Sequence, residues 1–447
     1  MSTKSIRMTE GNIKSIMIKF AFPIFLGSLF QQFYNIVDAI VVGNIVGQEA
    51  LAAVSSTGSL VFLLVGFFGG VFSGASVIIS RYYGAKDDAQ VKRAVGTTVF
   101  FGLVSGIVLT VIGTVFSPAI LRLMGTPSDV FSDAVAYLRT YFSGIIFVVL
   151  YNTACGIFQA VGDSKRPLYY LLISSVTNVI LDLLFVAGMN MGVKGAAVAT
   201  VISQAISSSL AFFRLNRIKD VYHVGLKTIC VDKDILKNII NIGLPSGIQN
   251  SVIALANVVV QSSINSFGSV AMAGNGAYSK IEGFAFIPIN AFTVSITTFV
   301  SQNLGAKQSE RAKEGAKFGV IFACVLAEII GVIFILFAPQ LIGIFGKSPD
   351  VIEVGAARAY VCSWFFFLLS FSHCIASVLR GAGMSKIPMF IMLSVWCVLR
   401  VAYINVVNIL FHKINLVFWA YPLTWFISSI LFLYYYKKSK WYEVGNN

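Results

Sequence analysis

Charged residues are scarce in this sequence of 447 residues, at 12% against 57% hydrophobic residues. A soluble domain of ordinary composition carries about 25% charged residues. Acids are the scarcer kind, with 19 Asp and Glu against 33 Lys and Arg. This composition excludes an ordinary water-soluble domain and indicates a protein whose main solvent is lipid.

The sequence also lacks the motifs of common enzymes. It contains no HExxH and no P-loop, and Gly66-Phe-Phe-Gly-Gly70 opens no strand–helix unit of the dinucleotide-binding kind. The six cysteines show no metal-ligand spacing, and five fall within expected membrane spans, as small apolar residues often do. We therefore expect no cofactor, no enzyme activity and no built-in ATP drive. Any transport would have to be powered by an ion gradient.

What the sequence has in abundance is long apolar runs. About 20 apolar residues are enough to cross a hydrocarbon layer roughly 30 Å thick. The first run is too long for a cleaved signal peptide and carries Asp38, so it should remain as a true span. We expect twelve spans, near 16–42, 55–80, 94–116, 134–160, 168–188, 195–214, 238–264, 276–301, 316–337, 354–380, 388–410 and 416–436.

The formal charge of +14 comes from basic residues that concentrate in every second loop between the expected spans. Lys and Arg gather at alternate loops, and the opposite loops hold only Arg122, Lys194, Lys347 and Lys413. By the positive-inside rule the basic loops are cytoplasmic, so both termini should lie inside a cell inner (plasma) membrane. The basic balance is then a topology signal with some attraction to the anionic lipid bilayer, and no nucleic-acid partner is expected.

Two stretches of the chain repeat each other at one offset. Ser80-Arg-Tyr-Tyr-Gly84-Ala-Lys86 reappears as Ser301-Gln-Asn-Leu-Gly305-Ala-Lys307. Gly162-Asp-Ser-Lys-Arg-Pro167 reappears as Gly383-Met-Ser-Lys-Ile-Pro388, and both displacements are 221 (305 − 84 and 383 − 162). A duplicated membrane protein is usually a transporter whose halves rock about a site between them.

Each half holds six expected spans, an even number, so both copies enter the bilayer from the same side. Their symmetry axis should lie along the membrane normal, which is the parallel kind of repeat. The predicted fold is an all-α membrane protein of twelve transmembrane helices in two six-helix lobes related by a parallel pseudo-two-fold repeat. We expect an N-terminal lobe over 1–216, a cytoplasmic linker over 217–236 and a C-terminal lobe over 237–447.

Two acids fall inside the spans of the first half. Asp38 lies late in the outward-running first span and Asp182 late in the outward-running fifth. Asn178 precedes Asp182 by one helical turn, and Thr200 comes early in the inward-running sixth span. All four side chains should therefore meet at one level in the outer half of the membrane. A charge at mid-bilayer costs roughly 2.5–3.5 kcal/mol on insertion scales, so its default interpretation is functional.

Tyr34, one turn before Asp38, and Asn152 are further candidates for this group. Carboxylates beside amide and hydroxyl oxygens suit two tasks, and the residue types do not choose between them. The acids could share a proton through coupled pKa values, or the four oxygens of Asp38, Asn178, Asp182 and Thr200 could hold a sodium ion. A third interpretation is that Asp182 and Asn178 only tie helices together.

The duplication supplies an internal control for these acids. At the step of 221, Asp38 corresponds to Val259 (38 + 221) and Asp182 to Tyr403 (182 + 221), so the second half keeps neither acid. If the six-span fold needed the acids, both halves should carry them. Their restriction to one half favours a specialised task.

The second half has buried ionisable residues of its own. Lys280 and Glu282 lie two positions apart, on different faces of one helix, and substrate binding and interhelical pairing are equally open for them. Gln249 is a third candidate for contact with substrate. Glu328 and Arg400 are expected to be structural.

These residues together resemble the multidrug and toxic compound extrusion (MATE) family. The resemblance covers the whole chain and rests on four fragments: Ala21-Phe-Pro23 followed by Asp38, Gly162-Asp-Ser-Lys-Arg-Pro167, Asn178 through Asp182, and Gly195-Ala-Ala-Val-Ala-Thr200. It implies a two-lobed V-shaped antiporter that exports organic, often cationic, compounds in exchange for sodium ions or protons. It places the ion site at Asp38, Asn178, Asp182 and Thr200. The second-lobe acids of other branches are missing between Pro245 and Gln261.

We therefore expect a monomeric antiporter that exports a small, lipophilic organic cation by alternating access. The cargo should bind between the lobes, in a cavity lined by aromatic and apolar side chains. One alternative is a flippase for a lipid-linked glycan precursor, which should show several cavity-facing basic residues in its first half, where only Arg139 lies away from loops. A second alternative is a membrane-embedded enzyme or a receptor.

Overall fold

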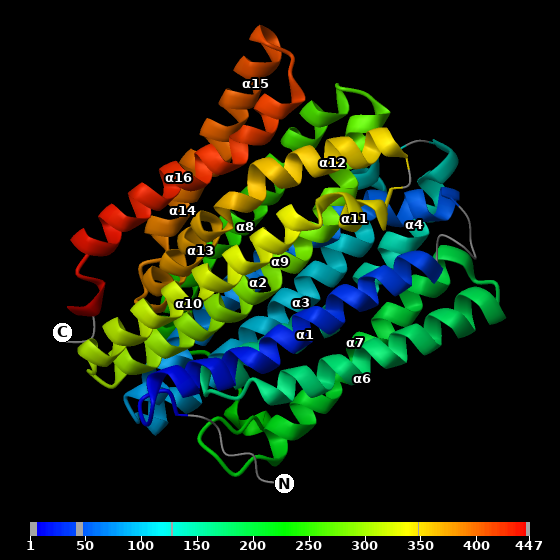
Figure 1. The fold of residues 1–447 in the computed structure, drawn as a ribbon. Coiled ribbons are helices and arrows are strands. Elements are labelled where there is room, and N and C mark those ends of the chain that lie inside the picture. Colours follow the sequence, from blue (N-terminus) through cyan, green and yellow to red (C-terminus); the bar gives the residue numbers. More distant parts are fainter. Residues whose placement is uncertain (1–6, 42–47, 127, 347, 444–447) are drawn as a thin grey trace.

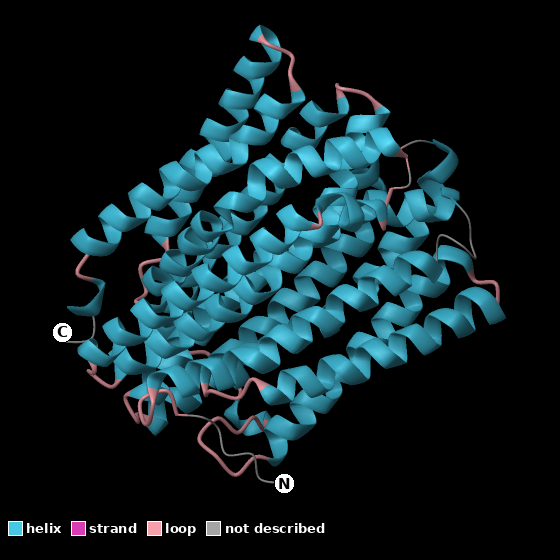
Figure 2. Cartoon of the chain, in the orientation of Figure 1, coloured by secondary structure: helices cyan, strands magenta, loops and turns pink. Residues whose placement is uncertain are grey.

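The computed structural model describes the backbone of residues 7–41, 48–126, 128–346 and 348–443, with all side chains in these ranges except those of 34–62, 129 and 226. The described chain is helical and contains no strand (Figure 2). Sixteen α-helices are numbered along it. Their bounds are α1 Ile13–Val41, α2 Gln48–Gly84, α3 Asp88–Leu123, α4 Ser128–Ser143, α5 Ile145–Ala160, α6 Lys165–Asp182, α7 Gly192–Arg217, α8 Lys233–Asn265, α9 Ser269–Gly305, α10 Ser309–Leu336, α11 Ala338–Gly343, α12 Pro349–Cys362, α13 Phe366–Gly381, α14 Lys386–Met392, α15 Arg400–Leu410 and α16 Ile414–Lys438.

The twelve expected spans are confirmed. In the described residues, eleven helical segments are long and apolar enough to cross a membrane, and the α4–α5 pair, bent by 46°, makes a twelfth. The bend falls at Gly144, directly between the two helices. In the second lobe, α12 and α13 form one span, and so do α14 and α15, joined by the π-helix Leu393–Leu399.

Two helices, α3 and α8, have an acidic residue at the N-cap, and both start at the same end of the bundle. Asp87 accepts a hydrogen bond from the backbone of Gln90 at the start of α3. Asp232 accepts from the backbone of Asp234 and Ile235, both at 3.1 Å, at the start of α8. A carboxylate satisfies the free N–H groups at a helix start and suits its dipole. We call this end of the bundle, where α2, α5, α7, α9, α13 and α16 finish, the basic side.

The two lobes meet where α2 of the first lobe packs on α8 and α9 of the second. In Figure 1, α1, α6 and α7 lie at one flank, α14 and α16 at the other, and α2, α8 and α9 run between them. α2 and α8 pack backbone to backbone: a Cβ on Gly70 would lie 2.5 Å from the nitrogen of Gly247, and a Cβ on Gly74 equally close to the nitrogen of Gly243. Small residues allow such close helix packing in membranes.

At the basic side α2 and α9 cross in a reciprocal way. A Cβ on Gly84 would lie 1.9 Å from the carbonyl oxygen of Gln302, and a Cβ on Gly305 would lie 2.0 Å from that of Arg81. The step of 221 relates both pairs, 84 to 305 and 81 to 302. The glycine that the two matching motifs share therefore lies where the lobes are in closest contact. The predicted parallel two-fold arrangement is confirmed.

Candidate functional site

The candidate ion site of the first lobe lies where α6 packs on α7. Asn178 and Asp182 are almost fully buried, at 2% and 1% exposure. We orient the Asn178 amide so that both of its polar atoms are satisfied. It then donates to Asp182 Oδ2 at 2.7 Å and accepts from the backbone N–H of Thr200 at 3.2 Å. The structure thus brings three of the four expected ion-site residues together.

The neighbouring contacts hold this group in place. The Thr200 hydroxyl donates to the carbonyl of Ala196 at 3.0 Å. One turn earlier on α6, Ser174 donates to the carbonyl of Ser203 on α7 at 2.9 Å. Directly after Asp182 the helix widens into a π-helix, Leu183–Gly188. π-Helical turns are rare and frequently lie at functional sites.

Two of the predicted residues, Tyr34 and Asp38, lie on α1, but their side chains are outside the part of the chain that the structure describes. The backbone of α1 is described as far as Val41, and this helix packs along α6. At Gly27 a Cβ would lie 3.4 Å from Leu171 of α6, so the two helices are in close contact there.

Asn152 makes a hydrogen bond within its own helix, α5. Its amide donates to the carbonyl of Val148 on its own helix, at 2.8 Å. Its side chain lines a cavity of about 290 Å³ within the first lobe, between α1, α2, α4, α5, α6 and α7. The structure therefore places Asn152 in a cavity wall.

This first-lobe cavity is polar but uncharged. Its wall carries the amides of Gln31, Asn152, Gln159 and Gln204, and the rings of tyrosines 141 and 151, and holds no Lys, Arg, Asp or Glu. The Oε1 atom of Gln204 is buried without a hydrogen-bond partner in the described chain. Sequence reasoning named Asn152 but missed the three glutamines, because glutamines on three different spans share no spacing that would connect them. A wall without basic residues does not favour a glycan flippase.

The second lobe holds a buried ion pair that includes one of the candidate substrate residues. Glu282 on α9 accepts from Arg358 on α12 at 3.1 Å. The Arg358 guanidinium also donates to Asn275 and lies 4.5 Å from the ring centres of Tyr278 and Tyr421. Glu282 therefore has a pairing partner on another helix, one of the two interpretations left open for it.

The remaining second-lobe candidates also have protein partners. The Lys280 ammonium lies over the ring of Phe345 at 5.3 Å. The Gln249 amide is buried and donates to the sulfur of Met392 at 2.8 Å. Arg400 donates to the Thr424 hydroxyl at 2.8 Å, in keeping with the structural role expected for it.

No metal centre of the usual kind forms in the described residues, which contain no group of three or more His, Cys, Asp and Glu side chains able to hold a metal. The described part of the predicted sodium site offers one carboxylate, one amide and one hydroxyl. Oxygen donors of this kind suit a hard cation. They suit proton exchange at a buried carboxylate equally well.

Comparisons with known proteins agree with this architecture. The MatE family model matches residues 23–184 and again residues 245–406, one match for each lobe. The probable multidrug resistance protein YoeA of Bacillus subtilis (strain 168) is 30% identical over 434 residues, covering 94% of this chain and 93% of that protein. The multidrug export protein MepA of Staphylococcus aureus (strain MSSA476) is 24% identical over 378 residues, covering 83% of this chain and 82% of that protein, and both relatives are named for drug resistance or export rather than for an enzyme activity.

Solved structures share the fold. The crystal structure of a MATE in complex with MaL6 superposes with a TM-score of 0.93 at 21% identity, and each chain is covered completely. The outward-facing conformation of a multidrug resistance MATE family transporter of the MOP superfamily gives a TM-score of 0.92 at 22% identity, again over both full chains. Since the family model matches both lobes and a relative is 30% identical over nearly its whole length, this chain belongs to the MATE family of membrane transporters.

Proposed function

We propose that this protein is an antiporter that exports small organic compounds, with lipophilic cations as the preferred class, and that a sodium ion or a proton at Asp38 and Asp182 drives it. The curated relative from Bacillus subtilis is named a probable multidrug resistance protein, which supports drug export here. The buried Asp182–Asn178–Thr200 group is the observation that carries the ion-coupling part, because an acid inside a membrane span is costly to bury and is by default a functional site.

Helix register supports the pairing of the two acids. α1 and α6 both start at the basic side and touch where Gly27 meets Leu171. Asp38 follows Gly27 by eleven residues (38 − 27), and Asp182 follows Leu171 by eleven (182 − 171). Helices running the same way rise equally, about 1.5 Å per residue. The two acids thus belong to one depth of the membrane, as a shared ion site requires.

The proposed coupling is a shift between two packings of the first lobe. Binding of the ion neutralises the acids and changes how α1 sits on α6 and α7, which biases the transporter toward one of its two states. An ion shifts such an equilibrium only through different affinities for the states. Tyr34 completes the group on α1.

We assign cargo to the first-lobe cavity that Asn152 lines. The expectation was a cavity between the lobes, but this cavity lies inside one lobe, where Leu171 of α6 and Gln204 of α7 line it on the two helices that carry the proposed ion site. Amide and tyrosine side chains without fixed charge suit a range of organic molecules, and tyrosine rings attract cations. The second-lobe candidates Lys280, Glu282 and Gln249 are assigned to structural contacts instead.

The orientation is part of this proposal. The basic side faces the cytoplasm, which places both termini there, in the inner membrane of the cell. The protein acts as a monomer, with lobes over 1–216 and 237–447 and a linker over 217–236 between them.

The test uses the purified protein in lipid vesicles loaded with a fluorescent organic cation. Export is measured under a sodium gradient alone and then under a pH gradient alone, for the wild type and for Asp38→Asn, Asp182→Asn and the control Asp133→Asn, an acid of the same lobe outside the proposed site. We expect one gradient to drive export, and each of the two site variants to lose it while the control keeps it. Undiminished gradient-driven export by Asp38→Asn and Asp182→Asn would refute the coupling role.

A further inference from the structure

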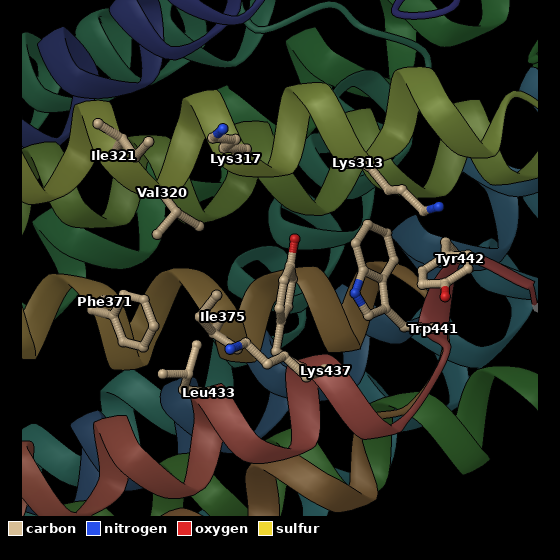
Figure 3. A pocket seen from close by; sticks show the side chains of 11 residues that line it. Lys313, Lys317, Val320, Ile321, Phe371, Ile375, Leu433, Lys437, Trp441 and Tyr442 are labelled. Carbon is tan, nitrogen blue, oxygen red and sulfur yellow. The ribbon is translucent and has the colours of Figure 1, made fainter.

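A second cavity opens on the outer flank of the C-terminal lobe, away from the proposed transport site. It lies between the basic-side ends of α10, α13 and α16 and has a volume of about 450 Å³ (Figure 3). One end is closed by Trp441 and Tyr442 of the short 3₁₀ helix Trp441–Glu443 that follows α16. Trp441 is 1% exposed, so this end is firmly packed.

The wall of the cavity divides into an apolar part and a cationic part. Val320, Phe371, Ile375 and Leu433 form the apolar part (Figure 3). Three lysines form the other: Lys313 and Lys317, one turn apart on α10, and Lys437 at the end of α16. An apolar wall beside ammonium groups fits an amphiphile with a negative head.

The positive charge of the three lysines is only partly compensated by nearby acids. Lys313 donates to Glu310 at 2.9 Å and its ammonium lies 3.7 Å from the ring centre of Tyr442. Among the described residues no acid lies within ion-pair distance of Lys317 or Lys437. Two ammonium groups thus remain for an anion.

The repeat shows that this cavity is not a general property of the lobe. In the first lobe the equivalent groove lies between α3, α5 and α7, and the linker that follows α7 fills it. A Cβ on Gly96 would lie 2.1 Å from the Thr228 carbonyl oxygen of the linker, and Asn216 donates to the carbonyl of Val224 at 3.0 Å.

Two of the first-lobe positions that contact the linker become lysines in the second lobe. Gly96 corresponds to Lys317 (96 + 221) and Asn216 to Lys437 (216 + 221). The first-lobe groove binds the backbone of the linker. Its glycine lets that backbone approach closely, and its amide donates a hydrogen bond to a linker carbonyl. The second-lobe groove offers two cations at the same places.

We propose that this groove of the C-terminal lobe binds one anionic phospholipid of the surrounding bilayer. Lys317 and Lys437, with Lys313 beside them, hold the headgroup phosphate, and an acyl chain lies along Val320, Phe371 and Leu433. The ammonium groups sit at the end of the spans, where phosphates of one leaflet lie, and the apolar wall continues toward the bilayer core. Basic side chains at this depth favour anionic lipids over neutral ones.

The test is thermal stability of the full chain in detergent, with added phosphatidylglycerol, phosphatidylethanolamine or inorganic phosphate. The charge variant is Lys313→Gln/Lys317→Gln/Lys437→Gln. Its control is Lys92→Gln/Lys219→Gln/Lys438→Gln, which removes three lysines that do not line the groove. A filling variant, Val320→Phe, keeps all charges and occupies the apolar part.

We expect phosphatidylglycerol to raise the melting temperature of the wild type and the control with saturation, and phosphatidylethanolamine to do so weakly. The charge variant should need at least about tenfold more phosphatidylglycerol for the same shift, since each of its three basic residues near an anionic surface contributes several-fold. The filling variant should respond less than the wild type.

Four results would overturn the proposal. An equal response to both lipids, or an unchanged response of the charge variant, would remove the anionic headgroup from the explanation. A full response to inorganic phosphate would reduce the site to an ion site. A response that appears only after residues 444–447 are deleted would make the chain's own end the occupant.

Discussion

Arg81 and Gln302 occupy equivalent positions of the two lobes, and each donates a hydrogen bond to the opposite lobe. The Arg81 guanidinium donates to the carbonyl of Ala382 at 2.8 Å. The Gln302 amide donates to the carbonyl of Ala160 at 2.7 Å. Both carbonyls lie where the fourth span of a lobe ends, so the pair fastens each lobe to the other at the basic side.

Loss of either donor should loosen this closure. A hydrogen bond to a charged group contributes about 1.5–3 kcal/mol, and a neutral one about 1 kcal/mol. The state that is open at the basic side is taken to be rare in the wild type. We therefore expect Arg81→Ala to raise the fraction of molecules in this open state about tenfold, and Gln302→Ala to raise it about fivefold. The exposed Lys92→Ala, on α3 of the same side, should change nothing.

Alkylation of Cys155 can measure this opening, because its side chain lines the first-lobe cavity. The other five cysteines are replaced, and a membrane-impermeant maleimide is applied to the basic side. The labelling rate should rise in the order Lys92→Ala, Gln302→Ala, Arg81→Ala. Equal rates in all three variants would show that these hydrogen bonds do not hold the lobes closed.

A second prediction concerns the glycines of α2. Gly70 is buried against the backbone of α8, whereas Gly69, its neighbour, has no atom within 4 Å of a Cβ position. Gly70→Ala should therefore force the two helices apart and cost about 1–3 kcal/mol, as overpacking does. Gly69→Ala should gain up to about 1 kcal/mol from helix propensity.

The melting temperatures of the two purified variants decide this prediction. Both substitutions add one methyl group to the same helix, so any general effect of alanine cancels in the comparison. If Gly70→Ala melts as high as Gly69→Ala, the close contact of α2 with α8 is not a requirement of the fold.

Much of this architecture could be predicted from the sequence, since apolar run lengths, basic loops and one repeat offset are local or additive signals. The offset of 221 even pairs Arg81 with Gln302, although only the structure shows that both donate across the interface. The grouping of Asn178, Asp182 and Thr200 was also within reach, because span direction fixes depth.

Contacts between side chains that lie far apart in the sequence could not be predicted. Glu282 and Arg358 lie 76 residues apart, and nothing in the spacing joins them. The first-lobe cavity could not be predicted for the same reason. Its amides come from helices whose rotation about their axes depends on packing of the whole lobe. Sequence patterns give the depth of a residue in the membrane more readily than the neighbour that it faces.

The last prediction tests whether Glu282 serves the structure of the second lobe, as its pairing indicates. Removing one partner of a buried ion pair leaves an uncompensated charge and typically costs about 3–5 kcal/mol. We expect Glu282→Gln to lower the melting temperature strongly, since Arg358 is 2% exposed and keeps its charge. Replacing both residues, as Glu282→Gln with Arg358→Met, removes that charge and should restore part of the loss. Recovery of stability in the double variant, with gradient-driven export retained, is the expected outcome. A double variant that is stable but transports nothing would instead place Glu282 or Arg358 in the transport machinery, because packing alone could not explain the loss.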